Sequence, residues 1–211
     1  MAREFGLGSQ LGIDLPGEES GLVPTTQWKK KVIGQEWYLG DTYHYGIGQG
    51  YLLTTPLQVN SWTATIANGG TVYRPHVLHT ANQQVNHPKF LSKNTVDLIR
   101  QGMIEGCQTG GVAWPLFHFT VKNANLPINT KDFQAVSSAS ADIRHVVIAC
   151  KTGTAQQGNA TALPHAWITG YAPAYHPQIV VTVLSESSGE GSNVAGPIAK
   201  EIFTKYFEGL K

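Results

Sequence analysis

Three apolar runs in the last third of the chain place the strongest constraint on its fold. They cover residues 145–152, 165–172 and 178–185. Each run has the length and the composition typical of a strand. The segment Pro173–Pro177 between the last two runs is short enough to require an antiparallel pair. An amphipathic helix is predicted to follow over residues 193–207, so the pattern indicates an α+β fold in which an antiparallel sheet is packed by helices.

Helices are also predicted earlier in the chain. The segment Thr55-Pro-Leu-Gln58 combines an N-cap hydroxyl, a proline at the first helical position and a capping-box glutamine. The stop signal of this helix is Asn68-Gly-Gly70. A second helix is expected over residues 92–107, where apolar side chains share one face. On the helix at residues 193–207, the expected apolar face consists of Ile198, Ile202 and Tyr206.

The remaining segments predict less regular structure. Residues 1–55 are rich in glycine, proline and polar residues and are expected to form loops and short pieces. Residues 71–77 indicate a short edge strand or an extended segment, because Pro75 cannot donate to a ladder. Residues 108–143 are expected to form an irregular segment on the surface, packed around a small aromatic cluster. That cluster consists of Trp114, Phe117 and Phe119.

Length and composition are those of one ordinary globular unit. The chain has 211 residues, a hydrophobic content of 41% and a formal net charge of +1, so it gives no indication of nucleic-acid binding. The run Lys29 to Lys31 is interpreted as a solvated loop. No stretch approaches the roughly 20 apolar residues of a membrane span, and residues 1–5 do not resemble a signal peptide. Spacing alone cannot pair Cys107 with Cys150, so both are expected to be unpaired and buried.

The segment Lys151-Thr-Gly-Thr154 carries the chemistry. It places a cation, a hydroxyl and a backbone without a side chain at the end of the run 145–152, which suits a carboxylate and an oxyanion. Lys-Thr-Gly is one of three motifs of penicillin-recognising serine enzymes, beside Ser-x-x-Lys and Ser-x-Asn or Ser-Asp-Asn. No serine of the chain begins a Ser-x-x-Lys motif. The chain is therefore expected to hold half of an active site. Strand alternation directs Cys150 away from the face of Lys151.

Other motifs favour structural roles. The loop Gly46-x-Gly-x-Gly50 has no strand before it and lacks the lysine and hydroxyl of a phosphate-binding loop. His76-x-x-His79 has no acidic partner at a useful spacing, so no metal and no cofactor is predicted. The acidic residues Asp14, Glu18 and Glu19 are interpreted as parts of a turn held by bonds between side chain and backbone. No Gly-x-Ser-x-Gly elbow occurs, which disfavours an α/β-hydrolase.

A series of ordered blocks resembles class B penicillin-binding proteins. The resemblance runs from about residue 5 to residue 207 and is weakest over residues 80–144. The blocks are Phe5-Gly-Leu-Gly8, Gly12-Ile-Asp-Leu-Pro-Gly-Glu18, Trp37-Tyr-x-Gly-Asp41, Gly46-Ile-Gly-Gln-Gly50, Thr55-Pro-Leu-Gln58, Ala67-Asn-Gly-Gly70, Lys151-Thr-Gly-Thr-Ala-Gln156 and His165-Ala-Trp-Ile-Thr-Gly-Tyr-Ala-Pro173. The Trp-Tyr-x-Gly-Asp block is most similar to the elongation-type penicillin-binding protein 2.

The resemblance implies a peptidoglycan D,D-transpeptidase with a fold like that of the serine β-lactamases. A serine attacks the D-Ala-D-Ala end of a stem peptide, and an amine of a second stem resolves the acyl-enzyme; β-lactams trap the same serine. Lys151 is expected to supply positive potential, and Thr152 is expected to bind the substrate carboxylate. Gly153 would admit the substrate backbone, and the N–H of Thr154 would be one oxyanion donor.

The departures from this pattern imply a fragment. Family order places both missing serine motifs before residue 1, so residues 1–211 are expected to be the C-terminal portion of one transpeptidase domain, inactive alone. Ser92-Lys-Asn94 matches Ser-x-Asn but opens a predicted helix, so capping is the better interpretation. The implied setting is the extracytoplasmic side of the bacterial inner membrane, with the anchor upstream and a membrane glycosyltransferase as partner. A serine β-lactamase-type hydrolase and a non-catalytic penicillin-binding interaction or sensor module remain the alternatives.

Overall fold

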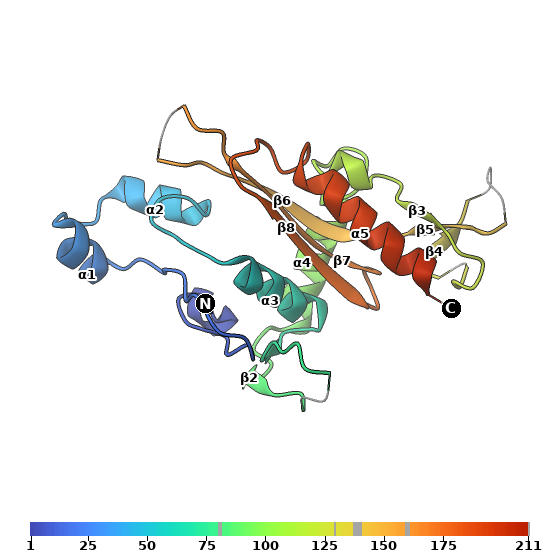
Figure 1. Ribbon diagram of the computed structural model, residues 1–211, viewed down its shortest axis with the longest axis horizontal. Coiled ribbons are helices and arrows are strands. Elements are labelled where there is room, and N and C mark those ends of the chain that lie inside the picture. Colours follow the sequence, from blue (N-terminus) through green and yellow to red (C-terminus); the bar gives the residue numbers. More distant parts are fainter. Residues whose placement is uncertain (80–81, 129, 137–140, 159–160, 211) are drawn as a thin grey trace.

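The computed structural model (Figure 1) describes residues 1–79, 82–128, 130–136, 141–158 and 161–210. Most of its helices lie in the first half of the chain, and most of its strands follow one another in the second half, before a last helix. The α-helices are α1 (Thr26–Trp28), α2 (Leu39–Gly46), α3 (Pro56–Ala67), α4 (Lys93–Gly106) and α5 (Ala195–Gly209). Short turns of other helix types are η1 (Ala2–Phe5), η2 (Lys29–Ile33) and η3 (Trp114–Leu116). Within the described ranges, none of these helices has the length and apolarity needed to cross a membrane.

Within the described residues, the strands form three separate antiparallel sheets. They are β1 (Val72–Tyr73), β2 (Val85–His87), β3 (Thr120–Lys122), β4 (Phe133–Ala135), β5 (Ile143–Val146), β6 (Ala149–Ala155), β7 (His165–Ala172) and β8 (Ile179–Ser185). Their orders are β1–β2, β3–β5–β4 and β6–β7–β8. The mixture of helices and antiparallel sheets confirms the predicted α+β class.

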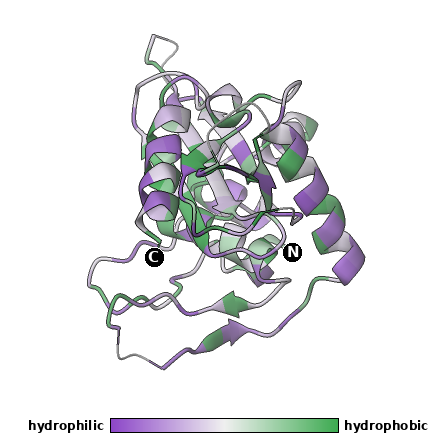
Figure 2. Ribbon diagram, turned by 90° about the vertical axis from the view of Figure 1, so that its right-hand side faces the viewer, coloured by the Kyte–Doolittle hydropathy of each residue, from purple (hydrophilic) through white to green (hydrophobic). Residues whose placement is uncertain are grey.

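Helices cover both faces of the sheet β6–β7–β8. Alternate strand residues point to opposite faces, and Ile168 lies in the core that contains Phe203 of α5. Tyr171 lies instead in a second core with Ala67 of α3 and Met103 of α4. In Figure 1, α5 lies along one side of this sheet, with α3 and α4 on the other. Figure 2 shows hydrophobic and hydrophilic residues alternating along the flanking helices, as expected for elements with one buried face.

The prediction of a single strand over residues 145–152 is wrong. The chain leaves one sheet at Val146 and enters another at Ala149. Val147 supplies the break, because its N–H donates to Asp132 O (2.9 Å) and its carbonyl accepts from Ala174 N (2.9 Å) rather than from a sheet neighbour. Residues on both sides of the break are buried. The apolar run is therefore continuous in the sequence, although its two parts belong to different sheets.

The irregular surface segment predicted over residues 108–143 is also partly wrong. This segment contributes η3 and two strands, and several of its apolar side chains belong to the main core. Phe119 is buried, whereas Trp114 is exposed. The strands β3 and β4 both pair with β5, so their partner lies beyond the polar stretch that suggested a loop.

The helix at the C-terminus was predicted correctly, but its buried face was not. The residues of α5 that enter the core include Ala199, Phe203 and Phe207. Ile198 and Ile202 of the predicted face are substantially exposed instead, whereas Tyr206, its third member, is partly buried and packs against the core. Both sets repeat every fourth residue, so periodicity alone could not choose between them. The buried set contains the two phenylalanines, which remove more apolar surface from water than the isoleucines.

The helix starts follow the sequence signals. Thr55 and Gln58 form the predicted capping box at the start of α3, and Ser92 caps α4 by accepting from Thr95 N. Gln58 also has a role that the motif does not reveal. Its fully buried amide donates to Ser9 O (3.0 Å) and Ser20 O (2.9 Å), so it fastens the N-terminal loops to α3.

The lysine run at residues 29–31 is not a uniformly solvated loop. Lys29 is only 3% exposed and pairs with Asp41 over 2.6 Å. Its ammonium also lies over the rings of Tyr38 (4.8 Å) and Tyr51 (5.7 Å). The hydrogen bond from Lys29 lowers the pKa of the Asp41 carboxyl. The sequence interpretation failed because neither the carboxylate nor the aromatic rings lie beside Lys29 in the sequence.

Candidate active site

The four residues Lys151 to Thr154 lie together on β6, an edge strand of the sheet β6–β7–β8. Strand β7 is the only pairing partner of β6 in the part of the chain that the structure describes, with Lys151 opposite Thr169 and Thr154 opposite Ala166. One side of β6 therefore has no ladder neighbour among these residues. Such an edge offers backbone donors and acceptors to an extended ligand.

Hydrogen bonds show which backbone groups face the open edge. Gln49 Nε2 donates to Thr154 O over 3.1 Å, and Lys151 Nζ donates to Thr152 O over 2.6 Å. In an antiparallel strand the N–H and C=O of one residue point to the same side. The N–H groups of Thr152 and Thr154 therefore point toward the open edge, away from β7.

The side chains of Cys150 and Lys151 lie on opposite faces of this strand, as predicted. Lys151 is exposed and Cys150 is completely buried, so the two face opposite sides. Thr154 is exposed, and Thr152 is half-buried. An ammonium group, a hydroxyl group and N–H groups that point toward the open edge are thus presented along about four residues of one accessible strand.

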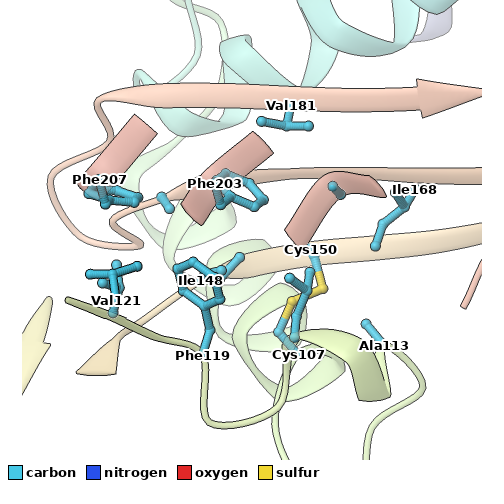
Figure 3. Packing of buried hydrophobic residues seen from close by; sticks show 14 of the residues in the cluster. Cys107, Ala113, Phe119, Val121, Ile148, Cys150, Ile168, Val181, Phe203 and Phe207 are labelled. Carbon is cyan, nitrogen blue, oxygen red and sulfur yellow. A yellow bond between two sulfur atoms is a disulfide. The ribbon is translucent and has the colours of Figure 1, made fainter. Parts of the chain in front are cut away.

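The two cysteines form a disulfide bond, so the expectation of unpaired thiols is wrong. Cys107 follows α4 and Cys150 precedes Lys151, with their Cα atoms 5.8 Å apart. Figure 3 shows the bond near Ala113 and Ile148, inside the core that α5 covers. It ties the end of α4 to the strand that carries the motif. Spacing could not reveal the pair, because 43 residues separate the two cysteines.

A glycine that the sequence analysis did not select packs against the motif. Gly191 is buried in the connection between β8 and α5. A Cβ atom at this position would lie 2.2 Å from Trp167 O and 2.6 Å from Gly153 O. Gly153 itself has Trp167 Cβ only 3.2 Å from the position of its missing Cβ atom. The backbone of Gly191 can therefore approach the backbones of Gly153 and Trp167 only because Gly191 lacks a side chain, and Gly153 packs tightly against the side chain of Trp167.

Replacing Gly191 with alanine is expected to destabilise the protein by about 3 kcal/mol, the upper range for overpacking, because rigid backbone oxygens cannot yield. Urea unfolding measures this loss. Gly102→Ala is the control, since Gly102 lies in α4 with open space around it. Gly102→Ala is expected to raise the free energy of unfolding by about 0.5–1 kcal/mol, because alanine has the higher helix propensity. Equal stability of the two variants would contradict the close packing of Gly191.

The other candidate motifs lie outside this site. His76 Nδ1 contacts Leu78 O (3.0 Å), and no cluster of metal-ligating side chains occurs in the described residues. Glu18 accepts from Gly12 N and Ile13 N, as the turn interpretation predicted. Asp14 instead accepts from Val77 N, and this hydrogen bond lowers the pKa of its carboxyl.

The glycine-rich loop at residues 46–50 does reach the site, through Gln49. No sequence motif indicated this contact or the packing of Gly191. The available signal for Gln49 was its position in one of the blocks shared with penicillin-binding proteins.

Comparisons with known proteins identify the family of the chain. The family model described as the penicillin binding protein transpeptidase domain matches residues 1–204. Peptidoglycan D,D-transpeptidase MrdA of Haemophilus influenzae is 33% identical over 97% of this chain. The chain spans only 31% of that relative's length.

Solved structures give the same result. A complex between penicillin-binding protein PBP2 and MreC from Helicobacter pylori is similar with a TM-score of 0.74 and 34% identity, over 98% of this chain and 34% of that one. A structure described as a peptidoglycan synthase complex that coordinates polymerization and crosslinking matches with a TM-score of 0.73 and 28% identity, over 100% of this chain and 32% of that one. The chain therefore belongs to the penicillin-binding protein transpeptidase family, among relatives of the class B, penicillin-binding protein 2 type.

Proposed function

We propose that residues 1–211 form the C-terminal portion of the transpeptidase domain of a peptidoglycan D,D-transpeptidase. The observation that carries this proposal is the open edge of β6, where Lys151, Thr152 and the N–H of Thr154 lie within one short segment. In the complete enzyme, a serine and a general base from outside these residues would face this edge. Family membership supports the reaction class.

In this proposal the strand binds the D-Ala-D-Ala end of a stem peptide. The Thr152 hydroxyl donates to the terminal carboxylate, and the Lys151 ammonium adds positive potential beside the carboxylate and the nucleophile. Gly153 has no side chain to hold the substrate backbone away from the strand. These groups bind and orient the peptide without taking part in bond making.

The serine hydroxyl attacks the penultimate D-alanyl carbonyl and passes its proton to the base. The resulting oxyanion accepts a hydrogen bond from the N–H of Thr154, which the open edge exposes. Collapse of this intermediate breaks the peptide bond, and D-alanine leaves with a proton. The amine of a second stem then attacks the ester, restores the serine and completes the cross-link. A β-lactam would follow the first half of this sequence and remain bound.

The proposed setting is the bacterial cell envelope, on the extracytoplasmic side of the inner membrane. A membrane glycosyltransferase is the proposed partner, since the synthase complex among the structural matches is described as coordinating polymerization with crosslinking. The complex of a related protein with MreC identifies a second class of partner to examine.

Intact-mass spectrometry after incubation with excess benzylpenicillin tests the proposal. The longer protein that carries this chain is expected to gain one penicilloyl group, whereas residues 1–211 alone are expected to gain none. Heat-denatured samples of both control for non-specific acylation. An adduct on the folded 211-residue chain would mean that the nucleophile lies within it. Rapid release of hydrolysed penicillin would indicate a β-lactamase, and binding of penicillin without acylation would indicate a sensor module.

A further inference from the structure

Gln49, which is far from Thr154 in the sequence, donates a hydrogen bond to the backbone of Thr154. Thr154 is the residue whose N–H would bind the oxyanion. Gln49 lies 105 residues before Thr154, and its side-chain amide donates to the Thr154 carbonyl over 3.1 Å. Gln49 is partly buried. The contact is on the same edge of β6 as the N–H that would bind the oxyanion, because both backbone groups of Thr154 point to one side.

The loop that presents Gln49 is fastened to the end of α2. Gln49 N donates to His44 O (2.9 Å), and Gly48 N donates to Tyr45 O (3.1 Å). Gly48 adopts φ 75°, a left-handed conformation that glycine adopts without strain. Hydrogen bonds to the last turn of α2 therefore fix the backbone of Gln49. The Cα atom that carries its side chain is held in one position.

Contacts at the N-terminal end of α2 hold this helix in place. Asp41 in the first turn of α2 accepts from Tyr38 N (2.7 Å) and pairs with the buried Lys29 (2.6 Å). These contacts link α2 to the preceding η2 turn, whose first residue is Lys29. A continuous set of hydrogen bonds thus runs from Lys29 through α2 to the carbonyl of Thr154.

We propose that Gln49 is a positioning residue for the oxyanion-binding N–H of Thr154; this inference rests on the function proposed above. The hydrogen bond from the Gln49 amide restrains the carbonyl of Thr154 and thereby the orientation of that residue's N–H at the open edge. An oxyanion donor is effective only if it is already aimed at the developing charge. A small displacement of such a group can cost about a hundredfold in rate.

The chemistry of the side chain matters to this role. The glutamine amide is a neutral donor, so it binds the carbonyl without adding charge beside the oxyanion site. A glutamate of the same shape could not donate when ionised. It would also place a negative charge next to the position where the reaction develops one. Gln49→Glu therefore combines a lost hydrogen bond with electrostatic repulsion, whereas Gln49→Met removes the hydrogen bond alone.

Stopped-flow acylation by benzylpenicillin, in the longer protein that carries this chain, separates the acylation rate constant from the dissociation constant of the initial complex. Gln49→Met is expected to lower the rate constant about tenfold, which is less than the loss of the oxyanion donor itself, and Gln49→Glu is expected to lower it about a hundredfold, the lower end of the range for a lost donor. The dissociation constant is expected to stay within about twofold, because the oxyanion forms only after binding.

Gln134→Glu is the matched control, because Gln134 is exposed on β4 in a different sheet. It makes the same charge change and is expected to leave both constants unaltered. Thermal unfolding of each variant checks that the fold is retained. A rate constant unchanged in folded Gln49→Met and Gln49→Glu would overturn the inference.

Two other outcomes also count against the inference. If Gln49→Met binds penicillin more tightly or is acylated faster, the Gln49 amide shields the Thr154 carbonyl from an incoming ligand instead of positioning the residue. If the unmodified longer protein is not acylated at all, the proposed function fails and the inference fails with it. A failure of the inference alone leaves acylation of the unmodified protein intact, so the two failures are distinguishable.

Discussion

Replacing Lys151 with methionine in the complete transpeptidase is expected to slow acylation by benzylpenicillin by about 10²–10³-fold, the range for removing one preorganised electrostatic contact from a transition state. The side chain of Lys151 is exposed on the edge strand β6 and reaches along it to the carbonyl of Thr152. Methionine keeps most of the length of the side chain but removes the charge and the donors. The acylation rate constant, followed by rapid-quench mass spectrometry, measures the effect.

Two further variants make this prediction specific. Lys151→Arg keeps the positive charge in a planar group of different shape, so it is expected to recover only part of the lost rate. Lys200→Met removes a charge from the exposed side of α5 and is expected to acylate normally. If Lys151→Met and Lys200→Met acylate at the same rate, Lys151 has no role in the reaction and the proposed site is wrong.

Removal of the disulfide bond is expected to lower the free energy of unfolding by about 4 kcal/mol in the double variant Cys107→Ala, Cys150→Ala. The bond closes a loop of 43 residues, and the chain-entropy model assigns about this value to a loop of that length. Urea unfolding of the double variant and of the unmodified protein, each with and without reducing agent, measures the change.

The reducing agent serves as the internal control for this prediction. It is expected to destabilise the unmodified protein by a similar amount and to leave the double variant unaffected. At temperatures where the double variant is folded, acylation is expected to stay nearly normal in the complete enzyme, because Cys150 faces the core and Lys151 faces away from it. A stability that does not respond to reduction would mean that the cysteines are not paired in solution.

Much of the fold was predictable because the signals for it are local. The capping box at Thr55 and Gln58 and the serine cap of α4 were confirmed. The strand pair β7–β8 was also correct, because a short connection allows only antiparallel pairing. Each of these features depends on residues within a few positions of one another.

The predictions were wrong where the local sequence fitted two structures equally well. The fourfold repeat of α5 fits a face containing Ile202 as well as one containing Phe203, and only the sheet decides which is buried. The run at residues 145–152 is continuously apolar from Val146 to Cys150, so its sequence does not show the break at Val147. The partner strands β3 and β4 lie in a segment whose polar composition resembled a loop.

The sequence by itself indicated the family of this protein, the strand that carries Lys151 to Thr154 and the caps of its main helices, because these depend on short ordered motifs. Only the tertiary structure decided the pairing of Cys107 with Cys150, the packing of Gly191 on Gly153 and the hydrogen bond from Gln49 to Thr154. The partners in these contacts are distant in the chain. Periodicity and capping are signals between residues close in the sequence, so they cannot reveal these contacts. The contacts form only when the helices and sheets pack against one another.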